Sequence, residues 1–166
     1  MPSLPLAVYT AAQVRALDRH AIESLGIPGY TLMTSAGEAA LTTLRGYWPA
    51  AQRVVVLCGP GNNGGDGYVL ARLARERRLD VKVIALADSA SLRGDAQRAW
   101  QDFIAAGGTT SAWSDDCLER SEVVVDVLVM EASSIFKRQL TAAQEELRQL
   151  LTYRQEAVLI IMGVLE

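Results

Sequence analysis

A short apolar strand followed at once by a glycine-rich segment is the feature that most constrains how this chain can fold. Residues 54–58 read Val-Val-Val-Leu-Cys, a run typical of a strand buried on both faces of a parallel sheet. The next segment, Cys58 to Gly67, contains five glycines, two asparagines and an aspartate. A helical pattern follows from Tyr68 to Arg78. The glycine-rich segment is therefore predicted to join a strand to a helix, where backbone N–H groups and a helix dipole favour anions.

The rest of the sequence alternates between helical and strand patterns. We predict helices starting near Thr10, over 32–48, 68–78 and 96–106 and within 131–156, and strands over 54–58, 81–86, 122–126 and 157–162. Strand, helix and strand within about 35 residues form a βαβ unit. The pattern predicts an α/β fold, a doubly wound α/β/α sandwich with a mainly parallel sheet, formed by residues 1–166 as a single domain.

Charge and composition exclude several classes of function. The net charge is −3, so no general field attracts nucleic acid or an anionic membrane. The longest apolar runs, 54–58 and 158–162, are too short to span a bilayer, and no secretory signal is visible. We therefore expect a cytoplasmic protein with no nucleic-acid or membrane partner. The one basic cluster, on the helix predicted over 68–78, is interpreted as a solvated helix face: Arg72, Arg75, Arg77 and Arg78.

The cysteines and the histidine do not suggest a metal site of the zinc type. Cys58 and Cys117 have no CxxC spacing, and His20 is the one histidine. Cys58 ends an apolar run and is predicted to be a buried small hydrophobic residue. His20 lies in a polar stretch and is predicted to be at the surface.

The glycine-rich segment itself allows more than one interpretation. Glycine permits positive φ angles and a close approach of the backbone to phosphate, so a phosphorylated ligand is predicted here, although such a segment could also serve only as a turn. Gly59 to Gly64 formally matches GxGxxG, and Asp88 follows the next strand, where a ribose-binding acid could lie. Asp66 would repel a phosphate at close range. It is interpreted either as the N-cap of the helix starting at Tyr68 or as a group that shares the site with a cation.

Asp126 supports the second interpretation of Asp66. It ends the strand predicted over 122–126, and the carboxyl ends of parallel strands lie at the same edge of a sheet as the glycine-rich segment. A buried carboxylate needs a partner or a bound ion. Oxygen ligands from Asn63 and Asp126 would suit a hard cation, although Asp126 could equally cap the next segment.

The residues from Gly59 to Gly67, followed by Tyr-Val-Leu-Ala-Arg72, resemble the signature of NAD(P)H-hydrate epimerases, the YjeF-type N-terminal domain. Segments that occur in the family's order are Thr10–Asp18, Leu32-Met33 with Ala36-Gly37, and Val123–Asp126. The resemblance covers roughly residues 7–128, and its central motif is more specific than GxGxxG.

This resemblance implies a Rossmann-like fold and an isomerase of metabolite repair, which interconverts the R and S epimers of hydrated NADH or NADPH. It implies that the hydrated nucleotide is bound by Asn62, Asn63, Gly64, Gly65 and Asp66. It also implies a potassium ion bound by Asn63 and Asp126. The partners that it implies are a second copy in a homodimer and a separate ADP- or ATP-dependent dehydratase.

After Leu128 the sequence departs from the family pattern. Val129–Ser134 replaces a substrate loop of Gly-Thr-Gly type, and Val158–Gly163 replaces an Asp-Ile-Pro-Ser-Gly segment that carries the family's acid/base aspartate. Epimerisation requires proton handling, so a carboxylate is expected as catalyst, but the sequence does not identify which one. Three hypotheses follow: an epimerase, a nucleotide-binding or interaction module that has lost its base, and an NAD-dependent dehydrogenase.

Overall fold

The computed structural model describes residues 11–127. The elements, in chain order, are α1 (Ala11–Glu23), α2 (Gly29–Tyr47), β1 (Arg53–Cys58), α3 (Gly61–Glu76), β2 (Asp80–Ala85), the 3₁₀ turn η1 (Ser89–Ser91), α4 (Gly94–Ala105), β3 (Thr110–Ser111) and β4 (Val123–Val127). The helices predicted within 131–156 and the strand over 157–162 lie outside the described residues.

The strands form one parallel sheet in the order β3-β2-β1-β4. Val54 pairs with Val81 on one side and with Val123 on the other, so β1 lies at the centre. This order follows the first half of a Rossmann sheet, in which the chain reverses its direction of growth next to the first strand. The prediction of a Rossmann-like α/β fold with a parallel sheet is therefore confirmed.

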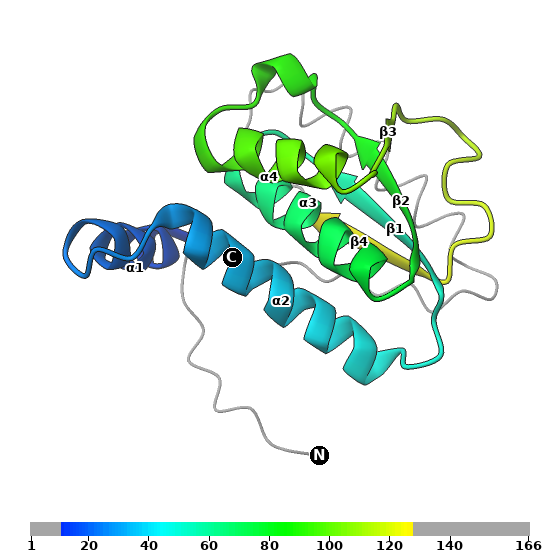
Figure 1. The fold of residues 1–166 in the computed structure, drawn as a ribbon, viewed down its shortest axis with the longest axis horizontal. Coiled ribbons are helices and arrows are strands. Elements are labelled where there is room, and N and C mark those ends of the chain that lie inside the picture. Colours follow the sequence, from blue (N-terminus) through cyan, green and yellow to red (C-terminus); the bar gives the residue numbers. More distant parts are fainter. Residues whose placement is uncertain (1–10, 128–166) are drawn as a thin grey trace.

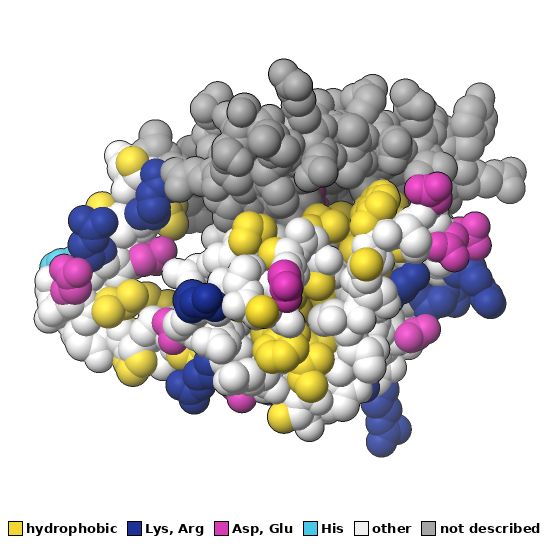
Figure 2. Space-filling view, turned by 90° about the horizontal axis from the view of Figure 1, so that it is seen from above, with side chains coloured by type: hydrophobic (Ala, Val, Ile, Leu, Met, Phe, Trp, Pro, Cys, Tyr) yellow, Lys and Arg dark blue, Asp and Glu magenta, His cyan; other side chains and the backbone are white. Residues whose placement is uncertain are grey.

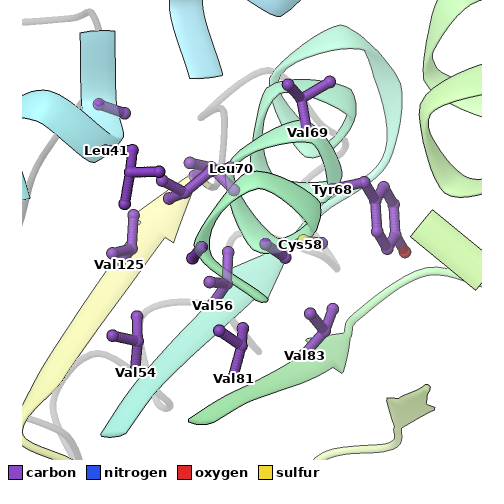
Figure 3. Packing of buried hydrophobic residues seen from close by; sticks show 14 of the residues in the cluster. Leu41, Val54, Val56, Cys58, Tyr68, Val69, Leu70, Val81, Val83 and Val125 are labelled. Atoms are coloured by element: carbon purple, nitrogen blue, oxygen red, sulfur yellow. The ribbon is translucent and has the colours of Figure 1, made fainter. Parts of the chain in front are cut away.

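The three helices α2, α3 and α4 cover one face of this sheet (Figure 1). Figure 3 shows the strand side chains Val54, Val56 and Cys58 directed toward α3, with Val83 and Val125 from the neighbouring strands beside them. These residues alternate along the strands with residues of the opposite face, as strand geometry requires. The alternate residues join a second apolar cluster: Val55, Leu57, Ile84, Cys117, Leu118 and Val124.

Helix α1 lies apart from this core (Figure 1). Its apolar residues Val14, Leu17 and Ile22 are 40%, 53% and 44% exposed. Hydrophobic side chains accordingly reach the surface at the α1 end of the molecule (Figure 2).

Helix α2 is joined to α4 by side-chain contacts. The Tyr30 hydroxyl donates a hydrogen bond to Asp102, and Arg98 lies 3.9 Å from the centre of the Tyr30 ring. Among the described residues, no helix is long and apolar enough to cross a membrane.

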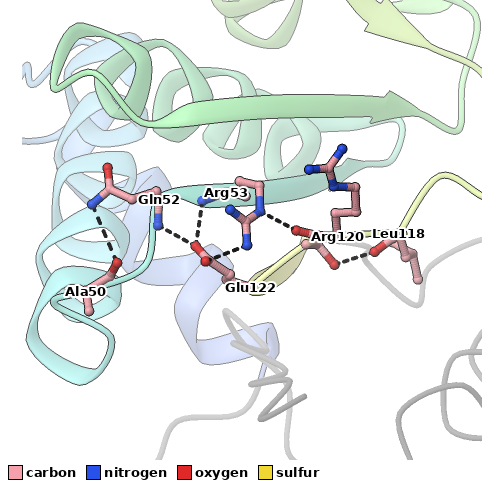
Figure 4. A network of polar contacts seen from close by, with 7 residues as sticks. Ala50, Gln52, Arg53, Leu118, Arg120 and Glu122 are labelled. Atoms are coloured by element: carbon pink, nitrogen blue, oxygen red, sulfur yellow. Dashed lines mark hydrogen bonds and ion pairs between the residues drawn. The ribbon is translucent and has the colours of Figure 1, made fainter. Parts of the chain in front are cut away.

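The amino ends of β1 and β4 are joined by a polar network, shown in Figure 4. The Glu122 carboxylate accepts hydrogen bonds from the backbone N–H groups of Gln52 and Arg53, at 2.6 and 2.9 Å. It also accepts one from the Arg53 guanidinium at 2.7 Å. These contacts lower the pKa of Glu122. The network fixes the register of the two strands at the edge opposite the glycine-rich segment.

Most predicted elements agree with the structure to within three residues at each end, but the start of α3 does not. The helix expected from Tyr68 begins at Gly61, so residues 61–67 form its first two turns rather than a loop. Asp66 therefore lies inside the helix, and its interpretation as an N-cap is also wrong; the N-cap is Pro60. The error arose because glycine and asparagine are poor helix formers, and here tertiary contacts override that tendency. The two-residue strand β3 was not predicted.

Candidate functional site

The candidate site lies at the carboxyl edge of the sheet, between β1 and β4. β1 leads through Gly59 and Pro60 into α3. In the sheet, β4 lies next to β1 on the side opposite β2. Leu57 pairs with Asp126, and Cys58 pairs with Val127, so both strands end at the same level. In open α/β sheets, ligands bind in the crevice at such a point of reversal. The structure thus brings the glycine-rich segment and Asp126 to one edge, as predicted.

The start of α3 presents asparagine side chains and backbone donors to this edge. The first N–H groups of a helix have no partner within the helix. Pro60 supplies no side-chain hydrogen bond to them. Asn62 is exposed and Asn63 is partly exposed. Gly61 has a φ of +79°, which allows the chain to turn from the strand into the helix. An anion could therefore meet the N–H groups of the first turn, together with the two side-chain amides.

The other glycines of the segment have a different role, because they leave room for neighbouring atoms. A Cβ at Gly64 would collide with the carbonyl oxygen of Gly59. A Cβ at Gly65 would lie 2.5 Å from Cε of Met33, and one at Gly67 would lie 2.6 Å from Cγ2 of Val127. All three glycines are buried. Close packing therefore accounts for Gly64, Gly65 and Gly67, whatever part their backbone takes in ligand binding.

Asp66 is the described site residue with the most altered acidity. Burial, and to a lesser extent the nearby charge of Asp18, together raise the pKa of Asp66 to about 7. Asp18 belongs to α1, so this exposed helix comes close to the site. Asp18 was not predicted as a site residue, since no local pattern signals an interaction between two helices so far apart in the chain.

Asp126 and Asn63 approach the edge from different faces of the sheet. Val123, Val125 and Val127 pack on the α3 side, whereas Val124 packs on the opposite side. Strand alternation places Asp126 with Val124, away from α3. Asp126 is 8% exposed. An ion held by both Asn63 and Asp126 would therefore have to lie beyond the strand ends rather than over either face. No group of three or more His, Cys, Asp or Glu residues suited to a metal occurs within residues 11–127.

The residues of the alternative interpretations have structural roles. Asp88 is exposed, and its carboxylate accepts a hydrogen bond from the N–H of Ala90 at 2.9 Å, which caps η1. Arg72 pairs with Glu76 on the same helix, and Arg75 donates to the carbonyl oxygen of Gly107. Cys58 is fully buried, and burial raises the pKa of its thiol, as expected for a core residue. His20 is exposed, as predicted.

A cavity of about 450 Å³ lies at the other, amino edge of the sheet, where Arg53, Asp80 and Lys82 contribute to its wall. None of the predicted site residues lines it. The carboxyl edge is the better candidate, because it combines the helix start with Asn63, Asp66 and Asp126.

Comparison with known proteins identifies the relationship. A profile of the family described as YjeF-related protein N-terminus matches residues 29–163. The chain belongs to this family. The match to the YjeF-related family continues past residue 128, where the resemblance by motif ended.

Two curated relatives of this YjeF-related chain have names that refer to NAD(P)H-hydrate. The Bifunctional NAD(P)H-hydrate repair enzyme Nnr of Coxiella burnetii is 44% identical over 122 residues, which are 74% of this chain and 25% of that protein. The NAD(P)H-hydrate epimerase of Bordetella pertussis strain Tohama I is 47% identical over 100 residues, 60% of this chain and 42% of that protein. The chain thus spans a quarter of the length of the bifunctional relative and less than half of the epimerase.

A solved structure supports the fold. The crystal structure of yeast ynu0, YNL200c, matches with a TM-score of 0.76 over 93% of this chain and 70% of that chain. The sequence identity is 20%, so this likeness concerns the fold alone.

Proposed function

We propose that this chain is an NAD(P)H-hydrate epimerase, which interconverts the R and S epimers of hydrated NADH and NADPH. The observation that carries the proposal is the helix start of α3, with its asparagines, at the reversal point of the sheet in a chain of the YjeF-related family. Relatives at 44% and 47% identity are named for the repair and epimerisation of this substrate. Residues 1–166 act as a single domain in this proposal.

The substrate would be held at the start of α3. The N–H groups of the first turn and the amides of Asn62 and Asn63 would bind its phosphates, since both offer donors to an anion. The backbone of Gly64 and Gly65 would line the same turn. Asp66 would also contact the substrate, and its pKa of about 7 would let the carboxyl group exchange a proton near neutral pH. Epimerisation at the hydrated carbon needs a group of this kind, and Asp66 is a described candidate for it.

Potassium is the proposed ion of the site. The amide oxygen of Asn63 and the carboxylate of Asp126 are hard oxygen donors, which suit potassium better than a transition metal. Asp126 lies near the carboxyl end of β4, beside the end of β1 that leads into α3. When bound there, the ion would supply positive charge to the site.

The cellular setting follows from the same proposal. A cytoplasmic location fits two free cysteines, both buried. The bifunctional names of relatives support a dehydratase as functional partner, either ADP- or ATP-dependent, that consumes one epimer. A homodimer remains part of the proposal, and sedimentation of the purified chain would test it.

The deciding experiment is an epimerisation assay. Purified R-form hydrated NADPH is supplied with an S-specific dehydratase as reporter, with and without potassium, and the spontaneous rate is subtracted. We expect turnover above the spontaneous rate that potassium stimulates. A folded chain that binds NADPH but never exceeds the spontaneous rate would instead be a binding module of this fold, and reversible hydride transfer would indicate a dehydrogenase.

Three matched variants test which residues hold the nucleotide. We expect Asn63→Ala and Asp66→Ala to weaken NADPH binding by about tenfold, the scale of one or two lost polar contacts. Asp88→Ala should leave the affinity within about twofold, because the Asp88 carboxylate already caps η1. Isothermal titration measures the three dissociation constants. A loss at Asp88 equal to or larger than the others would favour the dinucleotide-binding alternative.

A further inference from the structure

The first two turns of α3 have little intrinsic tendency to be helical. Four of the seven residues from Gly61 to Gly67 are glycine, a poor helix former. Pro60, at the N-cap, contributes no side-chain hydrogen bond. These two turns, which carry the proposed substrate residues, therefore depend on contacts with the rest of the protein for their conformation.

Met33 makes one of these contacts, at the centre of the segment. Its Cε and Sδ atoms lie 2.5 and 2.7 Å from the place where a Cβ of Gly65 would be. Cα of Ala96 lies 3.0 Å from the same place. Met33 is 5% exposed and belongs to the core cluster. Position 65 is thus enclosed between a methionine of α2 and the backbone of α4.

A second contact of the same kind shows that Met33 is part of a regular fit between α2 and α3. Four residues further along each helix the roles are exchanged, because a Cβ at Gly37 would lie 2.6 Å from Cγ1 of Val69. Each helix therefore inserts a side chain where the other has glycine. The two helices lie side by side and run in the same direction (Figure 1). This reciprocal fit determines where α3 begins relative to α2.

We propose that Met33 is a positioning residue for the nucleotide site. Its thioether fills the space beside Gly65 and keeps the first turns of α3, which carry Asn62, Asn63 and Asp66, in place at the carboxyl edge of the sheet. The choice of a nucleotide as ligand rests on the proposed function, whereas the packing of Met33 against Gly65 does not depend on it. Removal of the thioether leaves a cavity beside glycine, and the turn is then free to shift toward it.

The test compares three variants of the full chain by two measurements. Titration with NADP⁺ measures the dissociation constant, and ¹H–¹⁵N spectra report the backbone amides of residues 61–66. Met33→Ala should raise the dissociation constant about tenfold, since small displacements of binding groups are costly, and should shift those amide resonances. Met33→Leu keeps the volume and should stay within about twofold of the parent chain.

Leu44→Ala is the matched control. Leu44 is fully buried on the same helix, about 16 Å further along its axis. We expect this variant to lower the melting temperature as Met33→Ala does, while the dissociation constant and the amides of 61–66 stay unchanged. Equal behaviour of the two alanine variants in both measurements would overturn the proposal. If the parent chain itself fails to bind NADP⁺, the proposed function fails, and the amide shifts alone then decide whether Met33 positions the turn.

Discussion

Asp66 is a carboxyl group that the fold keeps close to its neutral form. Burial and the charge of Asp18 raise its pKa from 3.8 to about 7. Because the folded protein binds this proton more tightly than the unfolded chain, the group stabilises the fold fully below about pH 4, the unfolded value. That contribution is lost progressively as the pH rises toward 7, and above this value the folded state carries the cost of a partly buried charge.

The variant Asp66→Asn removes this dependence on pH. We expect it to equal the parent chain in free energy of unfolding near pH 4, and to exceed it at pH 8 by on the order of 2 kcal/mol, a value reduced for partial exposure to solvent. Urea denaturation at the two pH values measures the difference. Asp18→Asn should show a smaller gain of the same sign, since Asp18 is the lesser cause. A gain for Asp66→Asn that is the same at both pH values would contradict the account.

At the scale of elements, the start of α3 depends on glycines that leave room for other atoms. Gly64→Ala places a methyl group against the Gly59 carbonyl, where only backbone could move. We expect it to lower the free energy of unfolding by on the order of 3 kcal/mol. Gly46, on α2, has no atom within 4 Å of its Cβ position, and Gly46→Ala should raise stability by about 0.5 kcal/mol. Urea denaturation of both variants checks this contrast, and a similar change in each would refute it.

The start of α3 also shows which features local sequence patterns could predict and which they could not. The strand over 54–58 was predictable, because a run of β-branched residues favours a buried strand whatever surrounds it. The position of Asp126 at the carboxyl edge was predictable too, since it follows from the parallel sheet. The helical start at Gly61 was not, because its support comes from Met33, Gly59 and Val127, which only the folded chain brings together. The effect of Asp18 on Asp66 was hidden for the same reason.

At the scale of the whole molecule, stability is unevenly distributed between the sheet layer and α1. Leu41 of α2 is fully buried against the sheet, whereas Leu17 of α1 is 53% exposed. Leu41→Ala should lower the free energy of unfolding by about 2 to 5 kcal/mol, and Leu17→Ala should change it by less than about 1 kcal/mol. Urea denaturation measures both. A large loss at Leu17 would mean that α1 is buried in solution, against a second copy or another part of the chain.

The close packing around Gly64, Gly65 and Gly67 also affects how the sequences of related proteins should be interpreted. Selection for folding alone would favour glycine at positions 64, 65 and 67, because a Cβ at each would lie within 3 Å of a neighbouring atom. Their invariance in an alignment would therefore appear equally in active enzymes and in lineages that have abandoned the reaction. Asn62 and Asn63 are exposed and partly exposed. In a lineage that no longer binds the substrate, we therefore expect substitutions at Asn62 and Asn63 first, while the three glycines stay unchanged.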